Sequence, residues 1–116
     1  MDGKERVKQA ILNYILEKDQ VTYIEVERIF NEHSFEFKGD RSITSGMNEF
    51  VVLWNGWNKE AINIVNELFD ARLIKAEPTQ PINYIIDGGD LNLPLVKGVH
   101  RYKEDHWLPV ALRPIR

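Results

Sequence analysis

Three histidines and one acid–lysine pair are the side chains of this sequence that suggest catalytic or metal chemistry. His33, His100 and His106 lack the close spacing of metal ligands, and the chain has no cysteine that could join them. Glu36 and Lys38 stand at the E-x-K spacing used in metal-assisted phosphodiester hydrolysis, but no metal-binding aspartate is evident on a strand before them. The sequence also has no glycine-rich nucleotide loop. We therefore predict no catalytic residues, no metal, no cofactor and no enzymatic activity.

Residues that could contact a phosphate backbone are concentrated near the C-terminus. Residues 97–116 hold five bases against two acids, whereas residues 1–60 hold eight bases against eleven acids. Aromatic rings are interleaved with the cations Lys97, Arg101 and Lys103. This mixture is typical of surfaces that bind single-stranded nucleic acid or an acidic partner. The alternative is a solvated chain end in which Trp107 packs on the core.

Three amphipathic helices are predicted to position these residues. The i, i+3, i+4, i+7 spacing of a buried helix face occurs in three segments: residues 3–18, 23–33 and 59–72. Thr22 and Glu25 form the capping box that begins the second helix, and Asn58 is the expected N-cap of the third. On the second helix we expect Glu25 and Glu27 to face solvent.

The β-strands are predicted from short β-branched and aromatic runs. These runs are residues 50–54, 73–77 and 82–87. Asn55-Gly56 is expected to end the first run, and the polar residues 38–46 before it are expected to form a loop. The other two runs are joined by residues 78–81, which begin and end with proline, so we predict a β-hairpin. The proline-containing residues 88–116 are expected to wrap the core as an extended tail.

This order of elements resembles the winged-helix variant of the helix-turn-helix fold, over about residues 3–87. Val21 would be a one-rung strand, residues 58–72 the recognition-type helix, and residues 78–81 the tip of the wing. One departure is that roughly two dozen residues separate the second and third helices, where winged helices have a short turn. The resemblance implies an α+β fold, with three helices packed on a small antiparallel sheet that ends in a C-terminal hairpin wing and a tail.

Several short stretches are also similar to small proteins encoded by bacterial prophages and mobile pathogenicity islands. They are Val52-Leu53-Trp54-Asn55-Gly56-Trp57-Asn58, residues 83–89 with 91–94, and His106-Trp107-Leu108-Pro109-Val110. This resemblance implies a mobile-element context and no particular chemistry.

The predicted nucleic-acid-binding residues combine the third helix, the wing and the tail. They are Lys59, Asn63, Asn66, Arg72, Lys75, Lys97, Arg101 and Lys103. Asn63 and Asn66 could each hydrogen-bond an adenine edge. The same helix face carries Glu60, Glu67 and Asp70, which oppose a phosphate backbone. The alternative is therefore that both asparagines are only polar residues on a solvated face.

Two tryptophans are predicted to contact a partner. Trp57 follows the Asn55-Gly56 turn and Trp107 lies in the basic tail, and aromatic side chains often dominate the energy of protein interfaces. Burial of Trp57 between the third helix and the sheet is the alternative. The first predicted function is thus a non-enzymatic winged-helix-like module of a bacterial mobile element that binds DNA weakly or as part of a complex. A protein–protein adaptor or inhibitor of a host protein is the second, and a small metal-dependent nuclease is a remote third.

Length and composition exclude several classes of protein. With 116 residues, 43% hydrophobic and 28% charged, we expect one globular domain over residues 1–116. No apolar run approaches the ~20 residues of a membrane span, and no secretory signal is recognisable, so a cytoplasmic location is expected. The expected partners are DNA or a host or mobile-element protein, with no membrane. The oligomeric state stays open.

Overall fold

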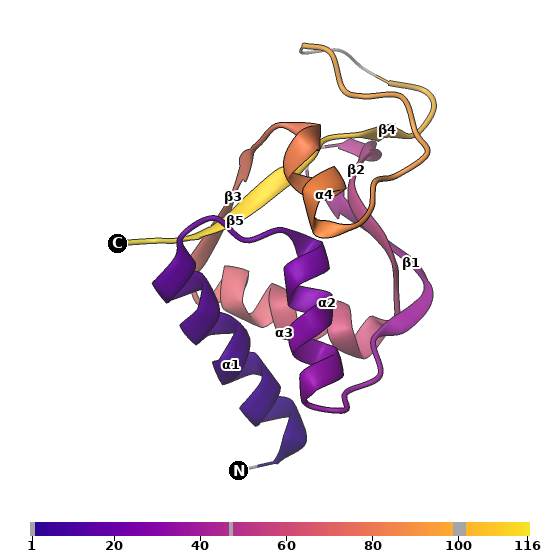
Figure 1. Ribbon diagram of the computed structural model, residues 1–116. Coiled ribbons are helices and arrows are strands. Elements are labelled where there is room, and N and C mark those ends of the chain that lie inside the picture. The colour runs from indigo at the N-terminus through magenta and orange to yellow at the C-terminus, as the bar shows by residue number, and fades with distance from the viewer. Residues whose placement is uncertain (1, 47, 99–101) are drawn as a thin grey trace.

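The protein has an α+β fold of four helices and two small sheets in the part of the chain that the structure describes. This structure is a computed structural model that describes residues 2–46, 48–98 and 102–116 (Figure 1). The helices are α1 (Gly3–Lys18), α2 (Tyr23–Glu32), α3 (Lys59–Asp70) and α4 (Pro81–Asp87). The strands are β1 (Lys38–Ser45), β2 (Asn48–Trp57), β3 (Ile74–Pro78), β4 (His106–Trp107) and β5 (Val110–Pro114).

The two sheets are built from strands that lie far apart in the sequence. In the first sheet, with order β1-β2-β4, β1 is antiparallel and β4 parallel to β2. In the second sheet, β3 and β5 are antiparallel, and Val21 forms an isolated antiparallel bridge with Leu112 of β5. The strand that follows α3 therefore pairs with the end of the chain, and β5 lies between Val21 and β3.

The three predicted amphipathic helices are confirmed, together with their N-caps. The Thr22 hydroxyl accepts a hydrogen bond from the Glu25 N–H, and the Glu25 carboxylate accepts one from the Thr22 N–H, which completes the capping box. The Asn58 side chain accepts from the Ala61 N–H at the start of α3. Since these caps satisfy N–H groups that have no partner within the helix, they fix where each helix begins.

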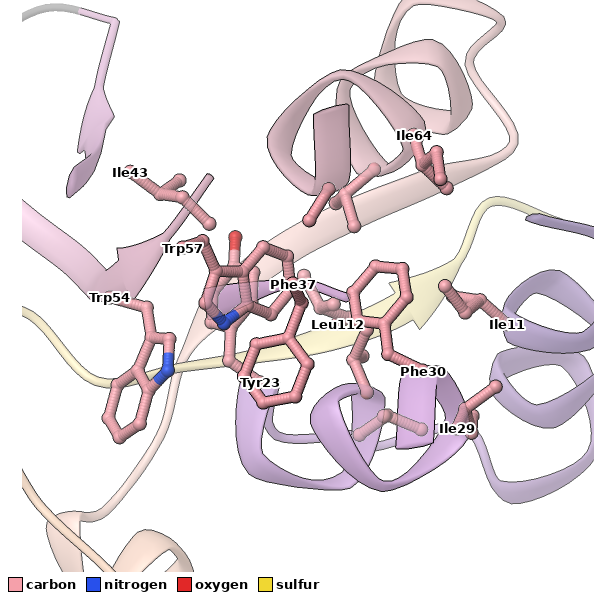
Figure 2. Close-up of a cluster of buried hydrophobic side chains, with 14 of the residues drawn as sticks. Ile11, Tyr23, Ile29, Phe30, Phe37, Ile43, Trp54, Trp57, Ile64 and Leu112 are labelled. Carbon is pink, nitrogen blue, oxygen red and sulfur yellow. The ribbon is translucent and has the colours of Figure 1, made fainter. Parts of the chain in front are cut away.

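Trp57 lies at the centre of the core between the helices and the first sheet (Figure 2). Its ring meets those of Tyr23, Phe30 and Phe37 edge-on, with centroid separations of 5.5, 5.2 and 6.2 Å. Edge-to-face packing of this kind aligns the positive edge of one ring with the negative face of the next. The aromatic cluster thereby joins α2 to the base of the β1–β2 hairpin.

The predicted hairpin of residues 73–77 and 82–87 is wrong. Residues 81–87 form α4, and β3 pairs with β5 instead. Pro81 occupies the first turn of α4, where its missing N–H costs nothing, and Gly88 ends the helix at φ 118°. Residues 78–81 are therefore not the tip of a two-stranded wing.

The predicted loop at residues 38–46 is also wrong, because residues 38–45 form β1. Its partner β2 does not end at Asn55-Gly56 as predicted, but continues to Trp57 with Gly56 at φ 87°. The register between the two strands shifts at several points, which is typical of β-bulges. At Gly39 an added Cβ would lie 2.7 Å from the backbone of Asn58, so only glycine allows this close approach.

Among the described residues, no helix is both long enough and apolar enough to cross a membrane.

Candidate nucleic-acid interface

The face of α3 that the sequence predicts to be exposed is exposed. Its buried residues are Ala61, Ile64, Val65 and Leu68, and its exposed residues are Lys59, Glu60, Asn63, Asn66, Glu67 and Asp70. Hydrophobic periodicity therefore predicted the orientation of the helix correctly.

A cationic hollow lies where the N-terminal half of α3 meets β1. Arg41 and Ser42 of β1, together with Lys59, Ile62 and Asn63 of α3, line a volume of about 350 Å³. Among the described residues, no carboxylate oxygen lies within 4.0 Å of a charged nitrogen of Arg41 or Lys59. Two cations free of ion pairs and two neutral polar side chains form a surface suited to phosphate oxygens.

Arg41 and Ser42 were not predicted from the sequence as site residues, because residues 38–46 were expected to form a loop. The β-branched pair Ile43 and Thr44 was the available signal for a strand. That signal is weak, since the segment also contains glycine and several charged residues.

The acidic residue Glu67 on the exposed face of α3 is compensated by α1. Lys4 and Lys8 place their ammonium nitrogens 3.4 and 3.5 Å from the Glu67 carboxylate oxygens. Desolvation acts to raise the pKa of Glu67, but the two lysines outweigh it and hold the pKa below its usual value. Glu67 therefore stays ionised and paired, while Glu60 and Asp70 have no ion-pair partner among the described residues.

The other predicted cations are not gathered around Lys59. Arg72 is exposed just beyond the C-terminal end of α3, at φ 57°. Lys75 lies on β3 and pairs with Glu77, with 3.0 Å between nitrogen and oxygen. Lys97 and Lys103 belong to the connection between α4 and β4, and the described parts of this connection project away from α3 (Figure 1). Arg101 lies outside the described residues.

Both tryptophans predicted to contact a partner are buried. Trp57 is fully buried and Trp107 is 2% exposed, and the Trp107 indole N–H donates to the Leu53 carbonyl oxygen at 3.2 Å. Neither ring lies on a surface where a partner or a base could stack on it. The alternative of core packing is what the structure shows, since a tryptophan ring gains most from burial.

Two acids of α2 that were predicted to face solvent instead hold the core together. Glu25 is 4% exposed and accepts hydrogen bonds from Tyr14, Lys18 and the Thr22 N–H. Burial acts to raise the pKa of Glu25, but these donors outweigh it and hold the pKa below its usual value. The hydrogen bond to Glu25 is the main cause that raises the pKa of Tyr14 to about 12. Glu27 accepts hydrogen bonds from the indole N–H groups of Trp54 and Trp57.

A larger cleft lies at the C-terminal half of α3, between the two sheets. It encloses about 510 Å³, and its lining includes Leu53 of β2, Phe69 of α3 and Val110 of β5. Tyr23 of α2 also lines it, and the Tyr23 hydroxyl is the buried side-chain polar atom that has no hydrogen-bond partner among the described residues.

Among the described residues, no three histidine, aspartate or glutamate side chains are grouped so that they could hold a metal ion. Glu36, of the E-x-K fragment, accepts a hydrogen bond from the Lys38 backbone N–H at 3.0 Å. A cationic hollow at the N-terminal half of α3 and an apolar cleft at its C-terminal half are therefore the two candidate sites.

No protein-family model matches the sequence, and neither a curated protein nor a solved structure matches it.

Proposed function

We propose that the chain is a non-enzymatic, winged-helix-like module that binds nucleic acid weakly through α3 and β1. The order of its elements supports the proposal: α1, Val21, α2, α3, β3 and β5 occur in the order of a winged helix, with β5 between Val21 and β3. In this interpretation two insertions expand the fold. The β1–β2 hairpin lies between α2 and α3, and residues 79–109 separate the two strands of the wing.

The observation that carries the proposal is the hollow between Arg41, Ser42, Lys59 and Asn63. Lys59 lies in the first turn of α3, where the positive end of the helix dipole adds to its charge and Glu60 in the same turn opposes it. Non-specific DNA affinity depends mainly on such cationic contacts, which release counterions from the phosphates.

The exposed acids of α3 set the expected strength and specificity. Glu60, in the first turn beside Lys59, and Asp70, at the C-terminal end, have no ion-pair partner among the described residues and repel phosphate, so they weaken the attraction of the cationic hollow. Phosphate contacts position a protein on DNA but carry no sequence information. We therefore expect weak binding with little sequence preference. A bacterial mobile-element origin stays a prediction of the sequence resemblance.

A protein–protein adaptor is the second candidate, and the apolar cleft beside α3 favours it. Leu53, Phe69 and Val110 give the cleft an apolar lining against which several apolar side chains of a partner protein would pack. The two candidate functions differ in the role of the cationic hollow, because a nucleic-acid-binding module uses it to contact phosphates and a protein–protein adaptor does not.

Fluorescence anisotropy with a labelled DNA duplex tests the proposal. Replacing both cations of the hollow, Arg41→Gln with Lys59→Gln, removes two charge-assisted contacts and should weaken binding at low salt by at least about tenfold. The matched control is Lys97→Gln with Lys103→Gln, which removes the same charge from the distant connection and should weaken binding by less than about threefold. Equal losses in the two double variants would contradict the proposed site, and wild-type protein that does not bind would favour the adaptor.

A further inference from the structure

We propose that the cleft between the two sheets is a binding site for a small aromatic amine. This site is separate from the cationic hollow and makes no use of Arg41 or Lys59.

The walls of the cleft are mainly apolar and come from both sheets and α3. Residues 43–46 at the end of β1, the β3–β5 sheet and α3 border about 510 Å³, and the apolar lining includes Ile43, Leu53, Phe69, Ala76, Pro78, Leu108 and Val110. Small-molecule sites commonly enclose about 300–1,000 Å³ within mainly apolar walls that carry a few polar groups. One protein side chain would leave much of this volume empty, so a small molecule fits it better.

The Tyr23 hydroxyl marks the deep end of the cleft. Figure 2 shows its oxygen on the end of the ring toward Ile43, a residue of the cleft wall. The Tyr23 side chain is fully buried, and its hydroxyl has no hydrogen-bond partner among the described residues. Buried hydroxyl groups nearly always have a partner, so the exception needs a cause. A ligand that brings its own polar atom into the cleft would supply the partner.

The neighbouring buried tyrosine, Tyr84, has hydrogen-bond partners for its hydroxyl, unlike Tyr23. The Tyr84 hydroxyl donates to the Val110 carbonyl oxygen at 2.6 Å and accepts from the Tyr23 backbone N–H at 3.3 Å. Burial raises the pKa of Tyr23 well above its usual value. The Tyr23 hydroxyl is therefore a neutral phenol at physiological pH, able to donate or accept one hydrogen bond.

The charge of the cleft comes from the C-terminal half of α3. Asp70 is the lining residue with a formal charge, and Asn66 lies one turn before it on the same face. No cation lies within 4.0 Å of the Asp70 carboxylate among the described residues. A ligand with an ammonium group would complement this carboxylate, whereas a ligand with a carboxylate would be repelled.

These three features define one class of ligand. The apolar walls require a hydrophobic ring system, the Tyr23 hydroxyl requires a polar atom on that ring, and Asp70 requires a cationic amine attached to it. Because the hydroxyl oxygen is buried, the wall beside it has to open before a ligand atom can bond to it.

Tryptamine and indole-3-propionate are a matched pair of probes, because they share the indole ring and N–H but carry opposite charges. Each is titrated into the isotope-labelled full chain, and the backbone amide shifts are followed by NMR. We expect tryptamine to shift the amides of Leu53, Phe69 and Ala76, and to bind at least about fivefold more tightly than indole-3-propionate, since one opposite charge at a partly exposed site is worth about 1 kcal/mol.

Two variants separate the polar contacts. Asp70→Asn should remove the preference for the cation and leave the two probes within about twofold of each other. Tyr23→Phe keeps the ring and should weaken both probes by about 3- to 10-fold, which is the value of one hydrogen bond.

Four results would each overturn the proposal. The first is that tryptamine at millimolar concentration causes no localised shifts in the cleft. The second is equal affinity of wild-type protein for the two probes. The third is that Tyr23→Phe leaves the affinity for both probes unchanged. Asp70→Asn is an independent check of the site, because Asp70 is exposed and its replacement does not threaten folding. Concentration-dependent shifts of the same amides without any probe would instead make the cleft a contact between two copies of the chain, and would also contradict the proposal.

Discussion

Glu27 is the residue on which we expect the aromatic core to depend most strongly. One carboxylate oxygen, Oε2, accepts from the indole N–H of Trp54 and from that of Trp57, each at 2.8 Å. Trp57 is fully buried and Trp54 is 6% exposed, and an indole nitrogen can only donate. Removing the acceptor therefore leaves two buried donors without a partner, at a cost of about 1–3 kcal/mol each.

We expect Glu27→Ala to lower the free energy of unfolding by about 2–6 kcal/mol, out of about 5–15 kcal/mol for a typical domain. Glu27→Gln keeps an oxygen with two lone pairs but loses the charge, so about half of that loss is expected. Urea denaturation followed by far-ultraviolet circular dichroism measures both. Glu32→Ala, at an exposed position of α2, is the control and should change stability by less than about 0.5 kcal/mol. Equal losses for Glu27→Ala and Glu32→Ala would refute the reasoning.

Two further predictions concern the tyrosines and the surface acids. Tyr84→Phe should lower the free energy of unfolding by about 1–3 kcal/mol, because it unpairs buried backbone groups. Tyr23→Phe removes an unpartnered hydroxyl and should leave the free energy of unfolding unchanged or raise it by up to about 1 kcal/mol. The urea midpoints of the two variants check this prediction, and the reverse order of stability would contradict it. Hydrogen bonds from Arg113 lower the pKa of the Asp19 and Glu77 carboxyl groups. The stability that these two carboxylates contribute is therefore complete above their unfolded pKa values of about 3.9 and 4.3, and it is lost as pH falls through their lower folded pKa values. Arg113→Met should flatten the fall in urea midpoint below about pH 4, and an unchanged pH profile would count against this network.

The elements that could be predicted from the sequence are those whose signals are local. Apolar periodicity and cap residues lie within the helix that they define, so residues 3–18 and 59–72 were placed well, and Thr22 marked the start of α2. The exposed face of α3 followed from the same periodicity, which is why Lys59 and Asn63 were identified.

The pairing of β3 with β5 could not be predicted, because its partners are separated by more than thirty residues and no local pattern encodes that contact. At residues 81–87 the β-branched isoleucines suggested a strand. The stronger signals were Pro81 at the first helical position and Gly88 after the last one, which together specify a short helix.

The sequence predicted only some of the residues at the candidate sites, because the others are brought there by contacts between distant segments. Lys59 was found from its helix, but its companion Arg41 reaches it through a strand that was expected to be a loop. The role of Glu27 depends on two indoles brought to it from another element. Since charged residues are usually exposed, sequence alone favours solvent at such a position.

The salt dependence of DNA binding tests the central claim most directly. Each phosphate that the protein neutralises contributes about −0.9 to the slope of log affinity against log salt concentration. We predict that wild-type protein binds a mixed-sequence duplex at low salt with a slope of about −2 or steeper, and that Arg41→Gln with Lys59→Gln flattens this slope by about two units. No measurable binding at low salt, where electrostatic attraction is greatest, or a slope that the double variant leaves unchanged, would contradict the account.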